Sequence, residues 1–421
     1  MDYYREINNL IEQQENWRSS CLNMIASENI TSKAVRNATI SDFQHRYAEG
    51  FLLGKDSEGL QLFDRFYQGT KYFDRIEALA MKLSEELFEA DHANVAPISG
   101  VVANLTAYYA LAQHGDVLFS LNIPSGGHIS HNKVSAAGVI GLRNISYPFD
   151  AKEMNIDVEE TKKLAIKERP KLFLFGGSLF LFPHPVNELR ELANELNAYI
   201  VYDAAHVLGL IAGKRFQDPF REGADVITSS THKTFPGPQH GLVMCKNEFR
   251  EKIDRAAFPG LTSNHHLHNI AGFAIALTEM MKFGKEYATQ IVKNSKSLGQ
   301  SMYELGFNVL CEHKGFTESH QIAIDVSKYG GGQKVAKDLE EANILVNKNL
   351  LPWESAKNSR NPSGLRIGVQ EMTRLGMKES EMKYVAGLMK KLVLDKTKTE
   401  EIKKDVIEFR KKYQKIHYCF D

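Results

Sequence analysis

The sequence has few cysteines, no long apolar run and no net charge, and each of these absences excludes a class of protein. The four cysteines are Cys21, Cys245, Cys311 and Cys419. They stand far apart and form no C-x-x-C pair, which excludes a disulfide framework and a cysteine-based zinc site. The strongest apolar stretch, residues 172–182, is too short to span a bilayer. Lys and Arg together number 52, as do Asp and Glu, so the chain offers no general attraction for nucleic acid or an anionic membrane.

The N-terminal residues lack the basic and then apolar pattern of a signal peptide, so we expect a cytoplasmic protein. The composition, with 43% apolar and 25% charged residues, is that of an ordinary globular protein, and 421 residues correspond to about two or three domains. His265, His266 and His268 form an H-H-x-H motif, but no other dense cluster of ligands accompanies it. We therefore expect no bound metal.

Hydrophobic patterning divides the chain into an N-terminal helical arm (1–40), a large domain (41–285) and a small C-terminal domain (286–421). In the large domain, continuous apolar strands alternate with helical patterns, which indicates a mostly parallel sheet covered on both faces: strands at 116–121, 171–175, 199–202 and 225–228, and helices at 77–89 and 185–197. Strands expected at 321–326 and 365–369, with a helix at 333–341, indicate a smaller α+β domain.

The ends of two predicted strands carry the strongest chemical signal. Asp203 follows the strand at 199–202, and Lys233 follows the strand at 225–228. Alone, such an aspartate is more often a helix cap, and a lone lysine is usually solvated. Together at one sheet edge they match pyridoxal 5'-phosphate (PLP), which needs an amine for a Schiff base and an acid against its pyridine nitrogen. His232 beside the lysine suits a tight polar pocket.

Four further residues could complete such a site. Ser99 and Gly100 precede an apolar helix, whose first N–H groups could bind a phosphate. His128, in a loop after an expected strand, could stack on a flat cofactor ring. Arg366 lies on a short strand between glycines and could bind a carboxylate with two parallel hydrogen bonds. Each residue alone also fits an ordinary role as a helix cap, a loop histidine or a surface arginine.

Taken together, these segments resemble the serine hydroxymethyltransferase family of fold-type-I PLP enzymes over about residues 22–382. The motifs that carry the resemblance are residues 25–29, 47–50, 125–128, 203–206, 231–234, 258–260, 346–349 and 363–366. The resemblance implies an α/β fold, in which a large domain holds a mostly parallel seven-stranded sheet and a smaller α+β domain follows. It also implies a homodimer with shared active sites, in which the N-terminal arm lies on the partner subunit.

The resemblance implies a role for each matching residue. Lys233 would carry the cofactor, and Asp203 would pair with its pyridine nitrogen. The remaining cofactor contacts would come from His128, His206, His232, Ser99, Gly100, Ser178 and Ser263. Arg366 and Ser27 would bind the substrate carboxylate. The substrate would also contact Glu49, the expected acid/base, and two tyrosines, Tyr47 and Tyr67. The partner subunit would supply some of these three side chains.

Several positions depart from the hydroxymethyltransferase pattern. Val101 replaces a second phosphate-binding serine, Gln239 replaces an arginine, and residues 261–264 replace a Gly-Gly pair. Trp353 stands where folate enzymes place an asparagine, either as ordinary core or as a lid over an aromatic aldehyde. Extra residues around 54–64 border the expected folate pocket.

Some segments instead resemble the L-threonine transaldolases, which use threonine and a free aldehyde without folate: 236–241, 263–264, 284–321 and 368–374. We therefore expect retro-aldol cleavage of the Cα–Cβ bond of L-threonine or L-serine, followed by addition to an aldehyde. Glu49 and residues 346–349 keep the folate-enzyme pattern, so tetrahydrofolate-dependent hydroxymethyl transfer is the alternative, and threonine aldolase activity is a second one. In each case the partners are a small amino acid and an aldehyde or one-carbon acceptor.

Overall fold

The computed structural model describes residues 2–420 and divides into two compact units. The large unit comprises residues 29–289 together with 418–420, and the small unit comprises residues 2–28 together with 290–417. The boundary near residue 290 falls inside the long helix α10 (Leu267–Glu304). The last residues of the chain belong to the large unit, where the ring of Tyr418 lies 5.2 Å from that of Tyr287.

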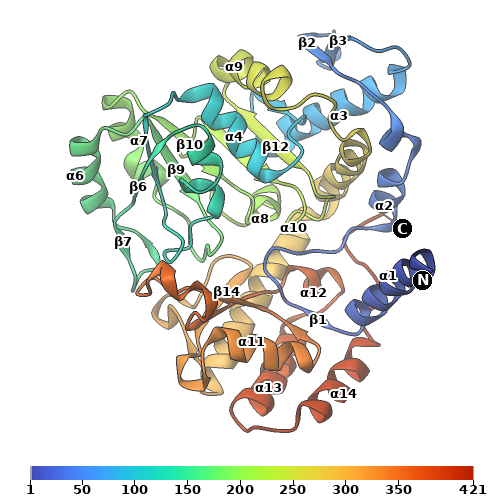
Figure 1. Cartoon of the computed structure of the whole chain (residues 1–421), viewed down its shortest axis with the longest axis vertical. Coiled ribbons are helices and arrows are strands. Elements are labelled where there is room, and N and C mark those ends of the chain that lie inside the picture. The colour runs from blue at the N-terminus through green and yellow to red at the C-terminus, as the bar shows by residue number, and fades with distance from the viewer. Residues whose placement is uncertain (1, 421) are drawn as a thin grey trace. The chain divides into compact units, whose positions relative to one another are not determined.

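A seven-stranded sheet forms the centre of the large unit, in the order β4-β12-β11-β10-β9-β5-β6 (Figure 1). The strands from β11 to β6 are parallel, whereas β12 runs antiparallel to both β11 and β4. Their bounds are β4 (His92–Asn94), β5 (Val117–Ser120), β6 (Arg143–Ser146), β9 (Leu172–Gly176), β10 (Tyr199–Asp203), β11 (Val226–Ser230) and β12 (Gly241–Cys245). The mostly parallel, seven-stranded sheet confirms the predicted fold class.

Helices cover this sheet because its strands are apolar on both faces, as in β9, in which every residue is buried. Helix α4 packs Ala103, Ala107 and Leu111 into a core with residues of the central strands. The helices of this unit before α10 are α2 (Lys33–Thr39), α3 (Lys71–Phe88), α4 (Gly100–Leu111), α5 (Ala136–Val139), α6 (Val158–Glu168), α7 (Val186–Glu195), α8 (Leu208–Ala212) and α9 (Arg250–Arg255). The helix predicted at 77–89 is the later part of α3.

Two antiparallel hairpins lie outside the main sheet of the large unit. One pairs β7 (Phe149–Asp150) with β8 (Asn155–Ile156). The other pairs β2 (Gly50–Lys55) with β3 (Gln61–Arg65), and it contains most of the extra residues noted at 54–64. This second hairpin exposes Phe51, Leu53 and Leu62 to about half of their full extent.

The small unit is built on an antiparallel four-stranded sheet, in the order β13-β14-β17-β16. Its strands are β13 (Asn308–Val309), β14 (Gln321–Asp325), β16 (Asn347–Asn349) and β17 (Gly364–Gly368). Its helices after α10 are α11 (Gly332–Glu341), α12 (Gln370–Arg374), α13 (Glu379–Val393) and α14 (Thr399–Arg410). A separate parallel pair joins β1 (Leu22–Asn23) to β15 (Ile344–Leu345). This arrangement confirms the smaller α+β domain.

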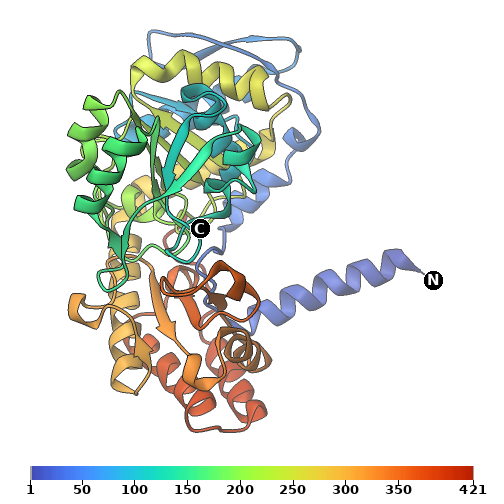
Figure 2. The same ribbon diagram turned by 60° about the vertical axis from the view of Figure 1, so that its left-hand side comes forward.

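Helix α1 (Tyr3–Ser19) projects from the small unit to which it belongs and buries none of its residues (Figure 2). The side chains of Ile7, Leu10 and Ile11 in this helix are each more than half exposed. No helix within residues 2–420 is both long enough and apolar enough to cross a membrane.

Candidate active site

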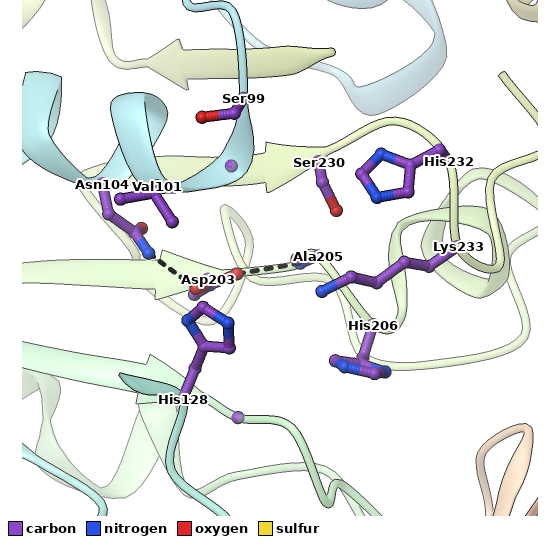
Figure 3. Close-up of a pocket in the computed structure, with 12 residues that line it drawn as sticks. Ser99, Val101, Asn104, His128, Asp203, Ala205, His206, Ser230, His232 and Lys233 are labelled. Atoms are coloured by element: carbon purple, nitrogen blue, oxygen red, sulfur yellow. Dashed lines mark hydrogen bonds between the residues drawn. The ribbon is translucent and has the colours of Figure 1, made fainter. Parts of the chain in front are cut away.

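A pocket in the large unit lies where β10 and β11 end and α4 begins (Figure 3). Its lining brings together seven of the residues predicted for the cofactor: Ser99, Gly100, His128, Asp203, His206, His232 and Lys233. The side chain of Lys233 points into the pocket toward Asp203 (Figure 3). Parallel strands place their carboxyl ends at one sheet edge, which explains why residues 30 positions apart in sequence meet there.

The Asp203 carboxylate is buried and held by three donors. Its Oδ2 accepts hydrogen bonds from Nε2 of His131 at 2.8 Å and Nδ2 of Asn104 at 2.9 Å, and its Oδ1 accepts the backbone N–H of Ala205 at 3.0 Å. Burial alone would raise the pKa of Asp203, but the hydrogen bond and charge of His131, with the charges of His128 and Lys233, hold it well below its usual range. The carboxylate therefore stays charged and fixed in orientation.

Asn104 and His131 were not predicted as site residues. Asn104 also donates to Oγ of Ser130 at 2.9 Å, and that hydroxyl lies 2.7 Å from Nδ1 of His128. The Oδ1 atom of Asn104 accepts from the Thr228 hydroxyl at 2.6 Å. One chain of hydrogen bonds thus orients both the Asp203 carboxylate and the His128 ring. The one feature of the sequence that could have indicated Asn104 is that it is the only amide side chain in the largely apolar helix α4.

The last residue of β9, Gly176, closely approaches the chain at Asp203. Gly176 has a φ of +95°, and a Cβ atom there would lie 2.1 Å from the carbonyl oxygen of Asp203. Glycine is therefore required at this position. The N–H of Gly176 donates to Nδ1 of His184 at 3.0 Å, and the next residue, Gly177, lines the pocket. Ser178, predicted to lie beside the cofactor ring, follows directly but does not line the pocket.

Two polar atoms in this pocket fit an anionic ligand. The hydroxyl of Ser230 and Nδ1 of His232 are buried and have no hydrogen-bond partner among residues 2–420. A Cβ atom on Gly100 would lie 3.2 Å from Cβ of Ser230, so this hydroxyl lies beside the first turn of α4. Burial, with the charge of Lys233, lowers the pKa of His232 to about 4, which keeps its ring neutral. The amine of Lys233, the fixed carboxylate of Asp203 and the start of α4 with the unsatisfied Ser230 hydroxyl fit PLP.

Besides Ser178, four predicted residues of the large unit do not line this pocket: Tyr47, Glu49, Tyr67 and Ser263. They form a second group, in which the Ser263 hydroxyl donates to Oε1 of Glu49 at 2.5 Å and the two tyrosine rings lie 5.2 Å apart. Tyr47 is 53% exposed and Tyr67 is 43% exposed. A single chain therefore does not bring the predicted acid/base to Lys233.

Arg366 and Ser27 belong to the small unit. Arg366 lies on β17, is nearly fully buried, and donates through Nε to Oδ1 of Asn347 at 3.0 Å. Burial lowers the pKa of Arg366 to about 10, so an anionic ligand would stabilise its charge. Ser27 is half-buried in the segment after β1.

The structure also shows the surroundings of Trp353 and of the H-H-x-H motif. Trp353 is 54% exposed, so its interpretation as a core residue is wrong. Nε2 of His265 lies 3.1 Å from Oε1 of Glu77, while the rings of His266 and His268 stack on each other. Within the described chain, 2–420, no group of three or more His, Cys, Asp or Glu residues could hold a metal ion.

Comparisons with known proteins agree with this geometry. A family model described as serine hydroxymethyltransferase matches residues 1–389. A curated serine hydroxymethyltransferase of Methanocaldococcus jannaschii is 57% identical over 97% of this chain and 94% of its own length. One of Archaeoglobus fulgidus is 53% identical over 98% and 92%. A solved L-threonine transaldolase from Pseudomonas fluorescens is 26% identical, with a TM-score of 0.88 over 99% of this chain and 93% of that chain.

These comparisons correct the prediction that transaldolase chemistry is the main activity. The curated hydroxymethyltransferases are about twice as similar in sequence as the transaldolase, over nearly the whole chain, and they favour the alternative. Short shared segments such as 236–241 and 368–374 carry less weight than this overall identity. The predicted kind of enzyme, a PLP-dependent transferase, is confirmed. The chain belongs to the serine hydroxymethyltransferase family.

Proposed function

We propose that this protein is a serine hydroxymethyltransferase, which interconverts L-serine and glycine and exchanges the β-carbon with tetrahydrofolate. The observation that carries the proposal is the pocket in which Lys233 faces a charged, buried Asp203 beside the start of α4. When bound, PLP supplies an electron-accepting ring that stabilises negative charge at the substrate Cα. The names of the curated relatives support the choice of reaction.

Different residues of the pocket bind different parts of this cofactor. The N–H groups at the start of α4, with the hydroxyls of Ser99 and Ser230, bind the phosphate. The Asp203 carboxylate keeps a proton on the pyridine nitrogen, because its charge is fixed by His131 and Asn104. We assign His128 to the ring face and His206 to the phenolic oxygen. Lys233 would supply the amine that holds the cofactor.

We assign the acid/base role to Glu49, which takes the proton of the serine hydroxyl. Its group with Tyr47 and Tyr67 is exposed and does not line its own chain's pocket. We therefore propose that this group completes the pocket of a second copy in a homodimer. The uncovered apolar side chains of α1 support this, because a helix with such a face gains stability when a partner covers it.

The test is glycine formation from L-serine by the purified holoenzyme, with and without tetrahydrofolate. We expect turnover that depends on the added folate. Acetaldehyde release from L-threonine, measured in parallel without folate, is expected to be slow in comparison. Serine cleavage that is equally fast without folate would contradict the proposal. Protein treated with borohydride, which reduces a Schiff base at Lys233, serves as the inactive control.

Replacing Arg366 with alanine is expected to raise the KM for L-serine about tenfold to a hundredfold, with a much smaller change in kcat. A hydrogen bond to a charged group contributes about 1.5–3 kcal/mol, which corresponds to this range. Initial rates over a series of serine concentrations give both constants. Arg360, which is exposed in the same unit, provides the control: Arg360→Ala should leave KM unchanged. An unaltered KM in Arg366→Ala would refute the assignment.

A further inference from the structure

Ser27 lies in a short segment, residues 24–28, which we call the strap. The strap follows β1 in the small unit and is fastened to its neighbours by backbone hydrogen bonds. The N–H of Met24 donates to the carbonyl of Leu345 at 2.8 Å, and the N–H of Gly368 donates to the carbonyl of Met24 at 2.9 Å. These bonds fix the start of the strap but do not set the conformation around Ser27.

Two buried side chains fix the rest of the strap. The Nε2 group of Gln370, the first residue of α12, donates to the carbonyls of Ile25 at 2.9 Å and Glu28 at 2.6 Å. Nε2 of His320 donates to the carbonyl of Ala26 at 3.1 Å. The side chains of Gln370 and His320 are fully buried, which limits the access of solvent to these three bonds. The side-chain amide of Gln370 thus bonds the backbone on both sides of Ser27.

The strap lies on the same face of β17 as Arg366. Arg366 and Gly368 are two residues apart on this strand, so their side-chain directions point to one face. A Cβ atom on Gly368 would lie 2.5 Å from Cα of Ala26 and 2.6 Å from Oε1 of Gln370. Only glycine allows the strap and Gln370 to come this close. Ser27, directly after Ala26, therefore lies in the segment that covers the face of β17 toward which Arg366 points.

We propose that Gln370 is a positioning residue for the substrate carboxylate, because it holds the Ser27 hydroxyl where it can bind the same carboxylate as Arg366. This inference rests on the proposed function, which assigns the carboxylate to Arg366 and Ser27. It gives a role to the segment 368–374, whose sequence departs from the usual hydroxymethyltransferase pattern. The neighbouring Glu371 holds β1, directly before the strap, since its Oε1 accepts from Nδ2 of Asn23 at 2.8 Å.

The experiment compares two ligands on PLP-loaded protein, by titration followed through the visible absorbance of the bound cofactor. Glycine carries a carboxylate, whereas methylamine offers only the amine. In Gln370→Met, which keeps the side-chain volume and removes both donors, we expect the Kd for glycine to rise about tenfold and the Kd for methylamine to stay unchanged. The affinity for PLP should also stay unchanged, because the cofactor residues belong to the large unit.

The control is Gln290→Leu in the same unit. It removes two hydrogen bonds of the same kind, from Nε2 of Gln290 to Asn294 at 2.9 Å and to Glu379 at 2.8 Å, and should leave both Kd values unchanged. If Gln370→Met does not fold, Gln370→Asn retains an amide that is too short to reach both carbonyls. It should raise the glycine Kd by a smaller factor.

An unchanged glycine Kd in a folded Gln370 variant would overturn the inference, as would equal weakening of both ligands. If the unmodified holoenzyme bound neither glycine nor serine, the proposed function itself would fail, and the inference with it. Normal glycine binding by the unmodified protein and by both Gln370 variants would overturn the inference alone.

Discussion

Replacing Lys233 with alanine is expected to lower the kcat for glycine formation from L-serine at least about a thousandfold. The amine of Lys233 holds the cofactor and must leave and return during each turnover, and no other lysine among the described residues lines the pocket. The fold should persist, because the side chain lies in a pocket rather than in the packed core. Steady-state rates, with the melting temperature measured in parallel, check both expectations.

The control for this variant is Lys214→Ala. Lys214 is about half exposed and pairs with Glu89 at 2.9 Å on the surface of the same unit. Removal of this ion pair should leave kcat unchanged, since exposed pairs contribute little. The absorbance of bound PLP gives a second measurement: borohydride should bleach the Schiff-base band of the unmodified protein, and Lys233→Ala should lack that band. Full activity in Lys233→Ala would end the assignment of the pocket as the active site.

Replacing Asp203 with asparagine is expected to lower kcat by roughly a hundredfold to a thousandfold, while the KM for L-serine changes little. Asparagine has nearly the same shape but no charge, so it cannot hold a proton on the pyridine nitrogen. The ring then accepts electrons less well, and the negative charge that develops at the substrate Cα is less stabilised. Rates measured with saturating PLP separate this effect from weaker cofactor binding.

Asp225→Asn tests whether loss of any buried carboxylate has the same effect. Asp225 is buried and pairs with Arg190 and Lys246, each at 2.8 Å, but it does not line the pocket. Its replacement should lower the melting temperature and leave the kcat of the folded enzyme unchanged. Equal losses of kcat in the two variants would show that Asp203 acts through stability and not through the cofactor.

The centre of the site could be predicted because it depends on strand order. Asp203 and Lys233 follow two strands that are recognisable by their continuous apolar residues, and neighbouring parallel strands end at one edge. His131 and Asn104 could not be predicted in this way. His131 lies 72 residues before Asp203 in the chain, and Asn104, on helix α4, lies 99 residues before it. No local spacing encodes such a contact.

The choice of reaction was the part that the sequence motifs predicted wrongly. Segment 368–374 resembled the transaldolases, yet in the structure Gln370 bonds the strap and Glu371 bonds Asn23 just before it, which is a structural task compatible with more than one reaction. The surroundings of Glu49 could not be derived from local sequence patterns. Its neighbours Tyr47 and Tyr67 are exposed in the single chain, which is what the proposed homodimer requires of them.

The uncovered helix α1 has a consequence for the exchange of its backbone amide protons with solvent. A helix of 17 residues that buries none of them is only marginally stable in water on its own. We expect its amides to open independently of the rest of the chain in an isolated subunit and to exchange almost as fast as those of a free peptide. Slow exchange there would require that another surface cover Ile7, Leu10 and Ile11. The protection of these amides would therefore report, residue by residue, on the proposed homodimer.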